Sequence, residues 1–276
     1  MNLEFTKMHG LGNDFVVING IDRHVDLTPD QIRRMADRHT GIGFDQLLLL
    51  QTSEDPAADV RYRIFNPDGN EVEQCGNGAR CIGQYLHEYA IVNTDVISAE
   101  TIKGIIRIYM EKGDAVRVNM GVPRFEPADI PIVVAQRQSI YQFKDADLQT
   151  DFQALSMGNP HAVILVNDVA VAEVEKWGKL FQQHAMFPQS VNVGFLQILD
   201  RKNVLLRVYE RGAGETLACG TGACAAIVAG IMTDKLDNEV TVGLNRGKLS
   251  ISWDGVGTEV WMTGPATTVY EGQITL

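Results

Sequence analysis

Residues 75–79 read Cys-Gly-Asn-Gly-Ala, and residues 219–223 read Cys-Gly-Thr-Gly-Ala. The two phrases lie about half of the 276-residue chain apart. Apolar residues follow each phrase at the three- and four-residue spacing of a helix with one buried face. Each cysteine is therefore expected at the start of a helix. The doubled phrase predicts two copies of one domain, related by a pseudo-two-fold axis and carrying one cysteine each.

The repeat extends beyond the cysteines. Three further pairs of segments match, and they come in the same order in both halves. They are 12–18 with 158–164, 43–44 with 194–195, and 63–66 with 207–210. Solenoid repeats have periods of ~20–50 residues, whereas this period covers half of the chain. We therefore expect two homologous domains.

Length and composition agree with this interpretation. At ~150 residues per domain, a chain of 276 residues corresponds to about two domains. A hydrophobic fraction of 45% is ordinary for a folded protein. The formal net charge of −11, without any Lys/Arg cluster, argues against nucleic-acid binding, which needs a basic surface.

The sequence predicts a cytoplasmic protein that does not enter the membrane. Glu4 and Asp14 interrupt the apolar core that an export signal needs. The run of small apolar residues at 223–232 is shorter than the ~20 residues that span a bilayer. Cysteines stay reduced in the cytoplasm, so the four in this chain serve packing, metal binding or chemistry. No Cys-x-x-Cys occurs, so we expect no metal site.

Apolar and alternating runs predict mostly strands. The expected strands are 3–7, 15–19, 47–51, 62–65, 105–110, 116–120, 162–166, 193–199, 204–209, 240–244, 249–253, 259–262 and 267–270. Two helices follow the cysteines, and two more are expected at 28–39 and 171–184. Prolines mark a linker at 119–131. The first domain is expected at 1–119 with 265–276, and the second at 120–264.

The phrase Cys-Gly-x-Gly before a helix suits proton transfer beside a carboxylate. A helix start stabilises a thiolate, which lowers the pKa of the thiol. The first N–H groups of the helix form an anion site, and glycine lets a substrate approach the backbone. Two such motifs supply a base for one face of an α-carbon and an acid for the other. This scheme needs no cofactor, and Gly10-Leu11-Gly12 lacks the remainder of a dinucleotide fingerprint.

The chain resembles the diaminopimelate epimerase family over nearly its whole length. The segments that carry the resemblance are 5–15, 65–81, 158–161 and 210–222. It implies a two-thiol epimerisation of LL-diaminopimelate to meso-diaminopimelate, in lysine and cell-wall precursor biosynthesis. The implied fold is α/β (α+β), with two pseudo-symmetric domains, each a mixed, β-barrel-like sheet wrapped around a central helix. The implied assembly is a homodimer with Tyr270 as a contact.

The resemblance also implies roles for individual residues. Cys75 and Cys219 would be the catalytic acid and base, with His161 and Glu210 setting their protonation states. Substrate-binding roles fall on Asn13, Gln46, Asn66, Gly76, Asn77, Asn159, Asn192, Glu210, Arg211, Gly220 and Thr221. Taken singly, these residues have ordinary alternatives. A lone cysteine is usually a small buried hydrophobe, and asparagines beside glycine or proline are often turn residues.

The mismatches within the repeat predict how the two ends of the substrate differ. Aligned on the cysteines, Asn66 falls opposite Glu210, and Pro67 falls opposite Arg211. Inversion of one carbon needs equivalent groups from the two halves. Recognition of a second stereocentre, which stays unchanged, needs groups that differ between the halves. We expect Arg211 to clamp the distal carboxylate and Glu210 to accept from an ammonium.

Other functions remain open at this stage. A proline or hydroxyproline racemase is the nearest alternative, although a histidine is typical where this chain has Asn77. From other classes, the cysteines could form a thiol–disulfide redox switch, or the chain could bind an amino acid without catalysis. A racemase of proline would not need the pair Glu210 and Arg211 for a distal amine.

Overall fold

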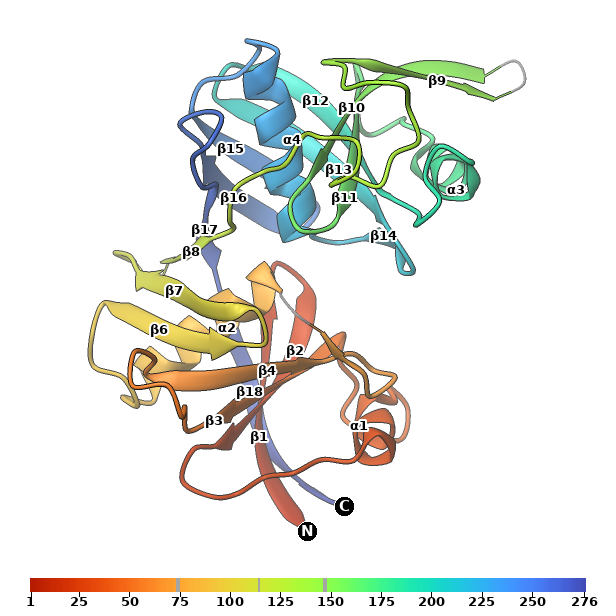
Figure 1. Cartoon of the computed structure of the whole chain (residues 1–276). Coiled ribbons are helices and arrows are strands. Elements are labelled where there is room, and N and C mark those ends of the chain that lie inside the picture. The colour runs from red at the N-terminus through yellow and green to blue at the C-terminus, as the bar shows by residue number, and fades with distance from the viewer. Residues whose placement is uncertain (73–74, 114, 146–147) are drawn as a thin grey trace. The chain divides into compact units, whose positions relative to one another are not determined.

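The computed structural model describes residues 1–72, 75–113, 115–145 and 148–276. The chain divides into unit 1, Met1–Asn119 with Gly264–Leu276, and unit 2, Met120–Thr263. The last strand therefore returns to the first unit, where it lies beside the first strand (Figure 1). The expected division differs from this one in the placement of Gly264.

Unit 1 is built on a mixed sheet. Its strand order is β18-β1-β2-β3-β4-β6-β7-β8, and the short β5 pairs with the end of β4. The pairs β2–β3 and β4–β6 are parallel, and the other pairs are antiparallel. The strands are β1 (Asn2–Gly10), β2 (Asn13–Gly20), β3 (Gln46–Gln51), β4 (Val60–Phe65), β5 (Glu71–Val72), β6 (Val96–Thr101), β7 (Gly104–Met110), β8 (Ala115–Asn119) and β18 (Thr267–Thr275).

Unit 2 repeats this pattern of pairing. Its order is β9-β10-β11-β12-β13-β15-β16-β17, and β14 pairs with the end of β13 as β5 does with β4. The position that β18 occupies beside β1 is taken by β9 beside β10. The strands are β9 (Tyr141–Asp145), β10 (Leu148–Ser156), β11 (Pro160–Leu165), β12 (Asn192–Asp200), β13 (Asn203–Glu210), β14 (Gly214–Thr216), β15 (Glu239–Leu244), β16 (Gly247–Ser252) and β17 (Trp261–Pro265).

Each unit holds one central helix, α2 (Gly76–Glu88) in unit 1 and α4 (Gly220–Met232) in unit 2. All residues from 222 to 230 in α4 are buried. A helix that is apolar on every side must be enclosed, and α4 lies within the curve of the strands of unit 2 (Figure 1). The expected fold class, a mixed sheet around a central helix in each of two α/β units, is confirmed.

The outer helices α1 (Pro29–Ala36) and α3 (Val174–Gln183) cover the other face of each sheet. Met35 of α1 packs in one cluster with Leu47 and Leu49 of β3. In unit 2, the ring of Phe181 in α3 stacks on Phe143, with centroids 4.1 Å apart. Because Leu48 is buried as well, β3 is covered on both faces, as its continuous leucine run indicates.

Some boundaries differ from expectation. Helix α1 begins after Thr28 as expected, and Thr28 forms a capping box there with Gln31, but the helix ends at Ala36 rather than near residue 39. Asp37 leaves the helix because its carboxylate accepts from the N–H groups of His39 and Thr40, at 2.8 and 2.7 Å. Helix α3 begins three residues later than expected. The antiparallel pair of β9 and β10 was not expected, because neither β9 nor the first half of β10 contains an apolar run.

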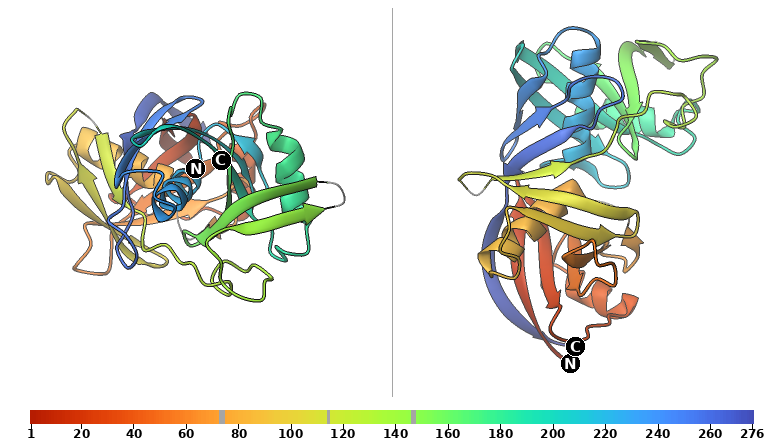
Figure 2. Two further views of the ribbon diagram at one scale, coloured as in Figure 1. Left: turned by 90° about the horizontal axis from the view of Figure 1, so that it is seen from above. Right: turned by 60° about the vertical axis from the view of Figure 1, so that its left-hand side comes forward.

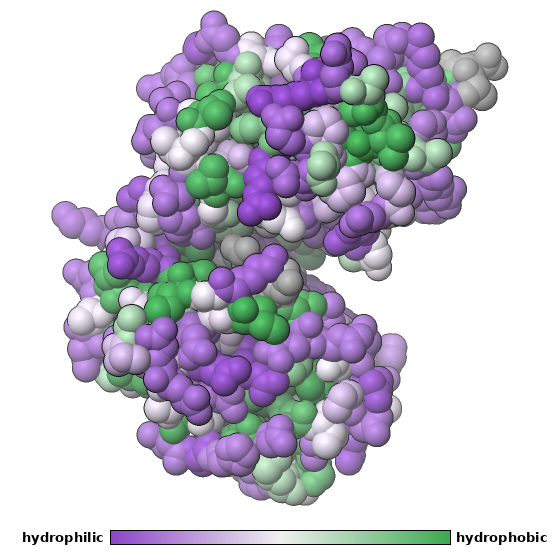
Figure 3. Space-filling view, viewed as in Figure 1, coloured by the Kyte–Doolittle hydropathy of each residue, from purple (hydrophilic) through white to green (hydrophobic). Residues whose placement is uncertain are grey.

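On the face drawn in Figure 3, the surface of unit 1 is mostly hydrophilic. Exposed hydrophobic side chains occur along β6 and β7 and in their turn, among them Val96, Ile102 and Ile105. The two chain ends lie together (Figure 2), and the Leu276 N–H donates to the Met1 carbonyl at 2.9 Å. None of the helices in the described part of the chain has the length and apolar character needed to cross a membrane.

Candidate active site

Cys75 is the N-cap of α2. Its backbone is extended, and its carbonyl accepts the first helical hydrogen bond, from the Ala79 N–H at 2.8 Å. Its Sγ accepts from the Gly78 N–H at 3.4 Å, which is the role of the oxygen in a capping serine. The half-buried thiol therefore lies where the N–H dipoles of the helix favour negative charge.

Cys219 is the N-cap of α4, but its surroundings differ from those of Cys75. The residue is only 4% exposed, and its Sγ lies 3.6 Å from the Thr221 hydroxyl. Burial, followed by the Glu210 carboxylate, raises the pKa of the Cys219 thiol well above its ordinary value. The helix start does lower this pKa as expected, through the Gly222 N–H, but desolvation and a neighbouring negative charge outweigh it. Cys219 therefore holds its proton at neutral pH.

In each unit, the second residue of the central helix is hydrogen-bonded to an asparagine side chain from outside the helix. In unit 1, Asn77 donates to the Asn13 amide oxygen at 3.1 Å, and Asn13 donates to Asp45 at 2.8 Å. In unit 2, Asn159 donates to the Thr221 hydroxyl at 3.3 Å. The matched positions of the sequence repeat therefore make matched contacts beside each cysteine.

Gln46 and Asn192 each begin a strand and occupy matching register positions, opposite Phe15 and His161. The structure therefore matches Gln46 with Asn192, which shifts the expected match of 43–44 with 194–195 by five residues. Gln46 donates to the Asn66 amide oxygen at 3.0 Å, and Asn192 accepts from the Arg211 N–H at 2.9 Å. The Gln46 Oε1 atom is buried and has no partner among the described residues. A buried acceptor without a partner is costly unless a ligand completes it, and an ammonium group would do so.

His161 is buried at 1% exposure and lies in β11. Burial, followed by the positive charge of Arg211, lowers its pKa to about 3, so its imidazole is neutral at physiological pH. Its Nε2 lies 2.9 Å from the Asn159 amide oxygen. Because the Asn159 amide nitrogen donates to Thr221, the oxygen accepts, and Nε2 carries the ring proton.

Glu210 and Arg211 follow each other at the end of β13. The Thr216 hydroxyl donates to the Glu210 carboxylate, which adjoins the Cys219 thiol. The exposed Arg211 guanidinium donates to the Gln189 carbonyl at 3.0 Å. This part of unit 2 thus offers a carboxylate and a guanidinium, where unit 1 has Asn66 and Pro67.

The model of the diaminopimelate epimerase family matches residues 5–126 and 153–269. The chain belongs to the diaminopimelate epimerase family. Proteins named diaminopimelate epimerase are 53% identical in Nitrosomonas eutropha, over all of both chains, and 51% identical in Nitrosospira multiformis, over all of this chain and 99% of the relative. The expected family is confirmed.

Solved structures with low sequence identity share the fold. A phenazine biosynthesis protein of the PhzF family from Bacillus anthracis matches with a TM-score of 0.72 and 18% identity, over all of both chains. A hydroxyproline epimerase from Agrobacterium vitis, with bound trans-4-hydroxy-L-proline, matches with a TM-score of 0.71 and 17% identity, over 99% of this chain and 92% of that one. At these identities the likeness shows the fold alone.

Each unit contains an arginine–glutamate ion pair at a matching position of the repeat. These two ion pairs were not predicted from the sequence. Arg63 binds both carboxylate oxygens of Glu71, at 2.9 and 2.7 Å. Arg207 binds Glu215 in the same way, at 2.6 and 2.9 Å. Each pair joins the longer strand of its hairpin, β4 or β13, to the short strand that precedes the cysteine, β5 or β14. The signal was present in the sequence, since each glutamate follows its arginine by eight positions.

Gly78 of α2 packs closely against β3 and β4. A Cβ at this position would lie 2.6 Å from the Tyr62 hydroxyl and 3.2 Å from a Leu48 methyl. We expect Gly78→Ala to lower the free energy of unfolding by about 1–3 kcal/mol, the range for overpacking a core. Denaturant titration would measure this change. Gly194→Ala, whose Cβ would meet Leu206 at 3.5 Å, is the control, and an equal loss in both variants would contradict the close fit.

The described residues contain no group of three His, Cys, Asp or Glu side chains placed to hold a metal ion. None of the four cysteines forms a disulfide. Cys81 is fully buried, and burial raises its pKa to about 12, so it packs rather than reacts. Cys224 is fully buried in α4.

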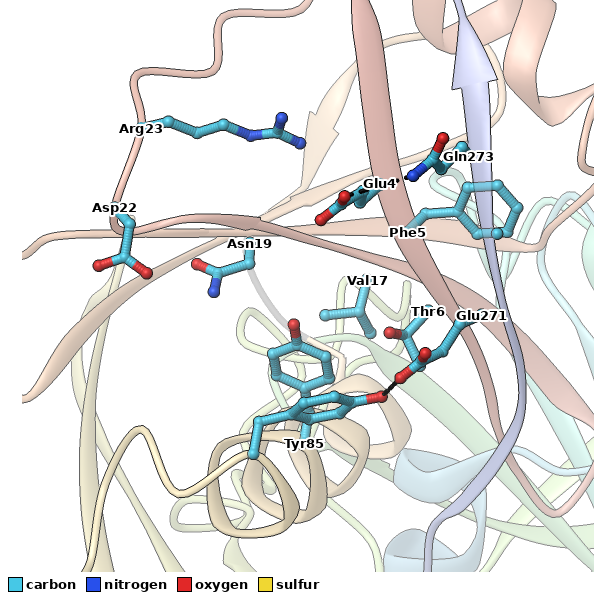
Figure 4. Close-up of a pocket in the computed structure, with 12 residues that line it drawn as sticks. Glu4, Phe5, Thr6, Val17, Asn19, Asp22, Arg23, Tyr85, Glu271 and Gln273 are labelled. Atoms are coloured by element: carbon cyan, nitrogen blue, oxygen red, sulfur yellow. Dashed lines mark hydrogen bonds between the residues drawn. The ribbon is translucent and has the colours of Figure 1, made fainter.

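Tyr270 lies on β18 of unit 1. It is 46% exposed, and its ring meets the edge of Phe5 with centroids 6.0 Å apart. A pocket of about 650 Å³ adjoins this strand and is lined by residues that include Tyr85 and Glu271 (Figure 4). Tyr85 follows Cys75 by about 15 Å along α2, so this pocket is separate from the candidate active site.

Proposed function

We propose that the protein is an epimerase that converts LL-diaminopimelate into meso-diaminopimelate by proton transfer between two thiols, without a cofactor. The observation that carries the proposal is the matched placement of Cys75 and Cys219. Each caps the central helix of its own unit. Membership of the diaminopimelate epimerase family supports this substrate, as do the names of the full-length relatives.

In the proposed reaction, one cysteine starts as a thiolate and the other as a thiol. The thiolate removes the α-proton of the substrate, which leaves a planar carbanion. The thiol then delivers its own proton to the opposite face of that carbon. The two sulfurs have exchanged protonation states, so the reverse reaction uses the same groups in opposite roles. Both cysteines must reach one α-carbon in the productive complex.

The starts of α2 and α4 would stabilise the carbanion. Its charge spreads onto the carboxylate of the reacting centre, where N–H groups fixed in advance are most effective. The first residues of the helices, Gly76 and Asn77 in α2 and Gly220 and Thr221 in α4, are our proposed carboxylate-binding groups. A helix start suits an anion because its N–H groups point outward and its dipole is positive there.

The polar residues around the cysteines would bind the remaining groups of the substrate. Gln46, with its buried amide oxygen, is our proposed acceptor for an ammonium group. Asn13, Asn159 and Asn192 orient that network through the contacts described above. At the distal end, Arg211 would bind the second carboxylate, in a place where unit 1 has only Pro67 to offer. The Glu210 carboxylate adjoins the Cys219 thiol, so it would act at the reacting centre rather than on the distal ammonium.

Substrate conversion tests the proposal directly. Purified, reduced protein is incubated with LL-diaminopimelate, and the isomers are separated by chiral chromatography. L-Proline and trans-4-hydroxy-L-proline are tested in parallel, because they are the substrates of the alternative racemase. We expect inversion of diaminopimelate only. Inversion of either imino acid without diaminopimelate turnover would contradict the proposal, and loss of all activity with a stable disulfide would favour the redox alternative.

We further propose that the enzyme works in the cytoplasm, in the route to lysine and cell-wall precursors. Its chemistry needs reduced thiols, which the cytoplasm maintains. None of the four cysteines forms a disulfide, in agreement with such a location.

We also propose a homodimer formed through β18. Among the described strands, β18 pairs only with β1, and Val269 and Tyr270 are 53% and 46% exposed on it. An edge strand with exposed apolar side chains is a ready surface for a second copy. We expect Tyr270→Asp to convert a dimer into a monomer in light scattering after size-exclusion chromatography. Val171→Asp, at a 76% exposed residue of unit 2, is the control. A monomeric wild type, or a dimeric Tyr270→Asp variant, would contradict the proposal.

A further inference from the structure

Thr216 has no role in the repeat or in the mechanism described so far. Its hydroxyl donates to the Glu210 carboxylate, and that carboxylate accepts from the Cys219 thiol. We propose that Thr216 is a positioning residue that holds the Glu210 carboxylate against Cys219, so that Cys219 begins the reaction as the thiol. The inference rests on the proposed function and assigns one direction of its proton transfer.

The hairpin of β13 and β14 brings the two side chains together. Val208 lies opposite Thr216, and Glu210 lies opposite Gly214. Residues two apart on a strand face the same side, so Glu210 and Thr216 are diagonal neighbours on one face. The Arg207–Glu215 ion pair fixes the register of the hairpin from the adjacent positions.

Unit 1 contains the same hairpin without this contact. Ile64 lies opposite Val72 there, as Val208 lies opposite Thr216, and the Arg63–Glu71 ion pair closes it. At the positions that match Glu210 and Thr216, unit 1 has Asn66 and Val72. The hairpin therefore forms without a hydroxyl–carboxylate bond. The Thr216–Glu210 hydrogen bond of unit 2 therefore has a role other than holding the hairpin together.

The chemistry of the contact explains what it serves. A hydroxyl that donates to a carboxylate favours the ionised form of that carboxylate and fixes the direction of one oxygen. The second oxygen is then available to the S–H of Cys219. Glu210 is the charged group that acts on this thiol from β13, while Thr221 and Gly222 act on it from α4 as donors. Burial and the ionised Glu210 together keep the proton on sulfur.

Selective alkylation of Cys219 tests the inference without any substrate. The rate of its reaction with iodoacetamide is followed against pH by peptide mass spectrometry, in the wild type and in Thr216→Val and Thr216→Ser. Valine keeps the shape and removes the hydroxyl, which frees the half-exposed Glu210 to turn toward water. We expect the Cys219 titration in Thr216→Val to move down by roughly one pH unit, as for one lost bond to a charged group. Thr216→Ser should titrate like the wild type.

A matched control lies in the same unit. Ser250 of β16 donates to the Glu239 carboxylate across the strand pair β15–β16, at 3.3 Å. Ser250→Ala removes a hydroxyl–carboxylate bond of the same kind and should change neither titration nor activity. Thr216→Ala, which adds no bulk, replaces the valine variant if valine disturbs the hairpin. In steady-state kinetics, Thr216→Val should lower kcat about tenfold at an unchanged KM.

A double-mutant cycle decides whether Thr216 acts through Glu210. If it does, adding Thr216→Val to Glu210→Gln causes no further shift of the Cys219 titration. Additive shifts, or a wild-type titration in Thr216→Val, would overturn the inference. If the wild type fails to invert diaminopimelate, the proposed function fails separately, and the alkylation data still decide whether Thr216 controls the thiol.

Discussion

Replacing either Cys75 or Cys219 by alanine is expected to lower kcat for diaminopimelate epimerisation by about 10³-fold or more. A positioned acid or base contributes ~10²–10⁴-fold, and neither half can supply the group that the other has lost. The effect should be similar for both cysteines, since each caps the central helix of its unit. Steady-state kinetics in both directions would measure it.

The remaining cysteines provide the controls. Cys81 and Cys224 are fully buried within the same helices, and alanine at either position should lower stability more than kcat. Thermal unfolding of all four variants separates loss of chemistry from loss of fold. Retention of most activity by Cys75→Ala or Cys219→Ala, in a folded protein, would exclude the two-thiol mechanism.

Replacing Glu210 by glutamine is expected to lower kcat about 10²-fold and to shift its pH dependence. Glutamine keeps the shape of the side chain and removes its charge. Burial and the Glu210 carboxylate both raise the pKa of Cys219, so removing the charge lowers that pKa. In the direction in which Cys219 is the acid, activity is lost as pH rises through this pKa. The alkaline limb of the profile should therefore move to lower pH.

Glu239→Gln is the control for this prediction, because Glu239 is an exposed glutamate of the same unit that also accepts a hydroxyl hydrogen bond. Its pH profile should match that of the wild type. An alkaline limb that stays in place in Glu210→Gln, or moves to higher pH, would show that Glu210 does not keep the proton on Cys219.

Much of the fold could be predicted because the same local sequence patterns occur in the same order in both halves of the chain. The Cys-Gly-x-Gly phrases marked both central helices, and the leucine run of β3 marked a strand that is covered on both faces. Thr28, followed by Pro29, marked the start of α1, since an N-cap and a proline in the first turn are local signals. The strand β10 could not be predicted in this way. Its place beside β11 follows from pairing in the folded unit, and its first half is polar.

The contacts among the candidate site residues were easier to predict than their electrostatics. Asn13 and Asn159 make matched contacts because the repeat places them at matched positions. By contrast, the pKa of Cys219 depends on how deeply the sulfur is buried and on a carboxylate from another strand. The contribution of Thr216 is a side-chain contact within a hairpin. No periodic pattern in the sequence encodes either property, so the two halves looked more alike than they are.

Proton exchange with solvent tests the central claim, that each unit contributes one thiol to the inversion of one carbon. The protein is incubated with LL-diaminopimelate in D2O, and both isomers are examined by mass spectrometry at low conversion. The two-thiol account predicts that meso-diaminopimelate carries one deuterium at its inverted α-carbon, while the remaining LL-isomer carries none. A product that retains the original α-hydrogen would contradict it, because a single base would then have moved the same proton from one face to the other.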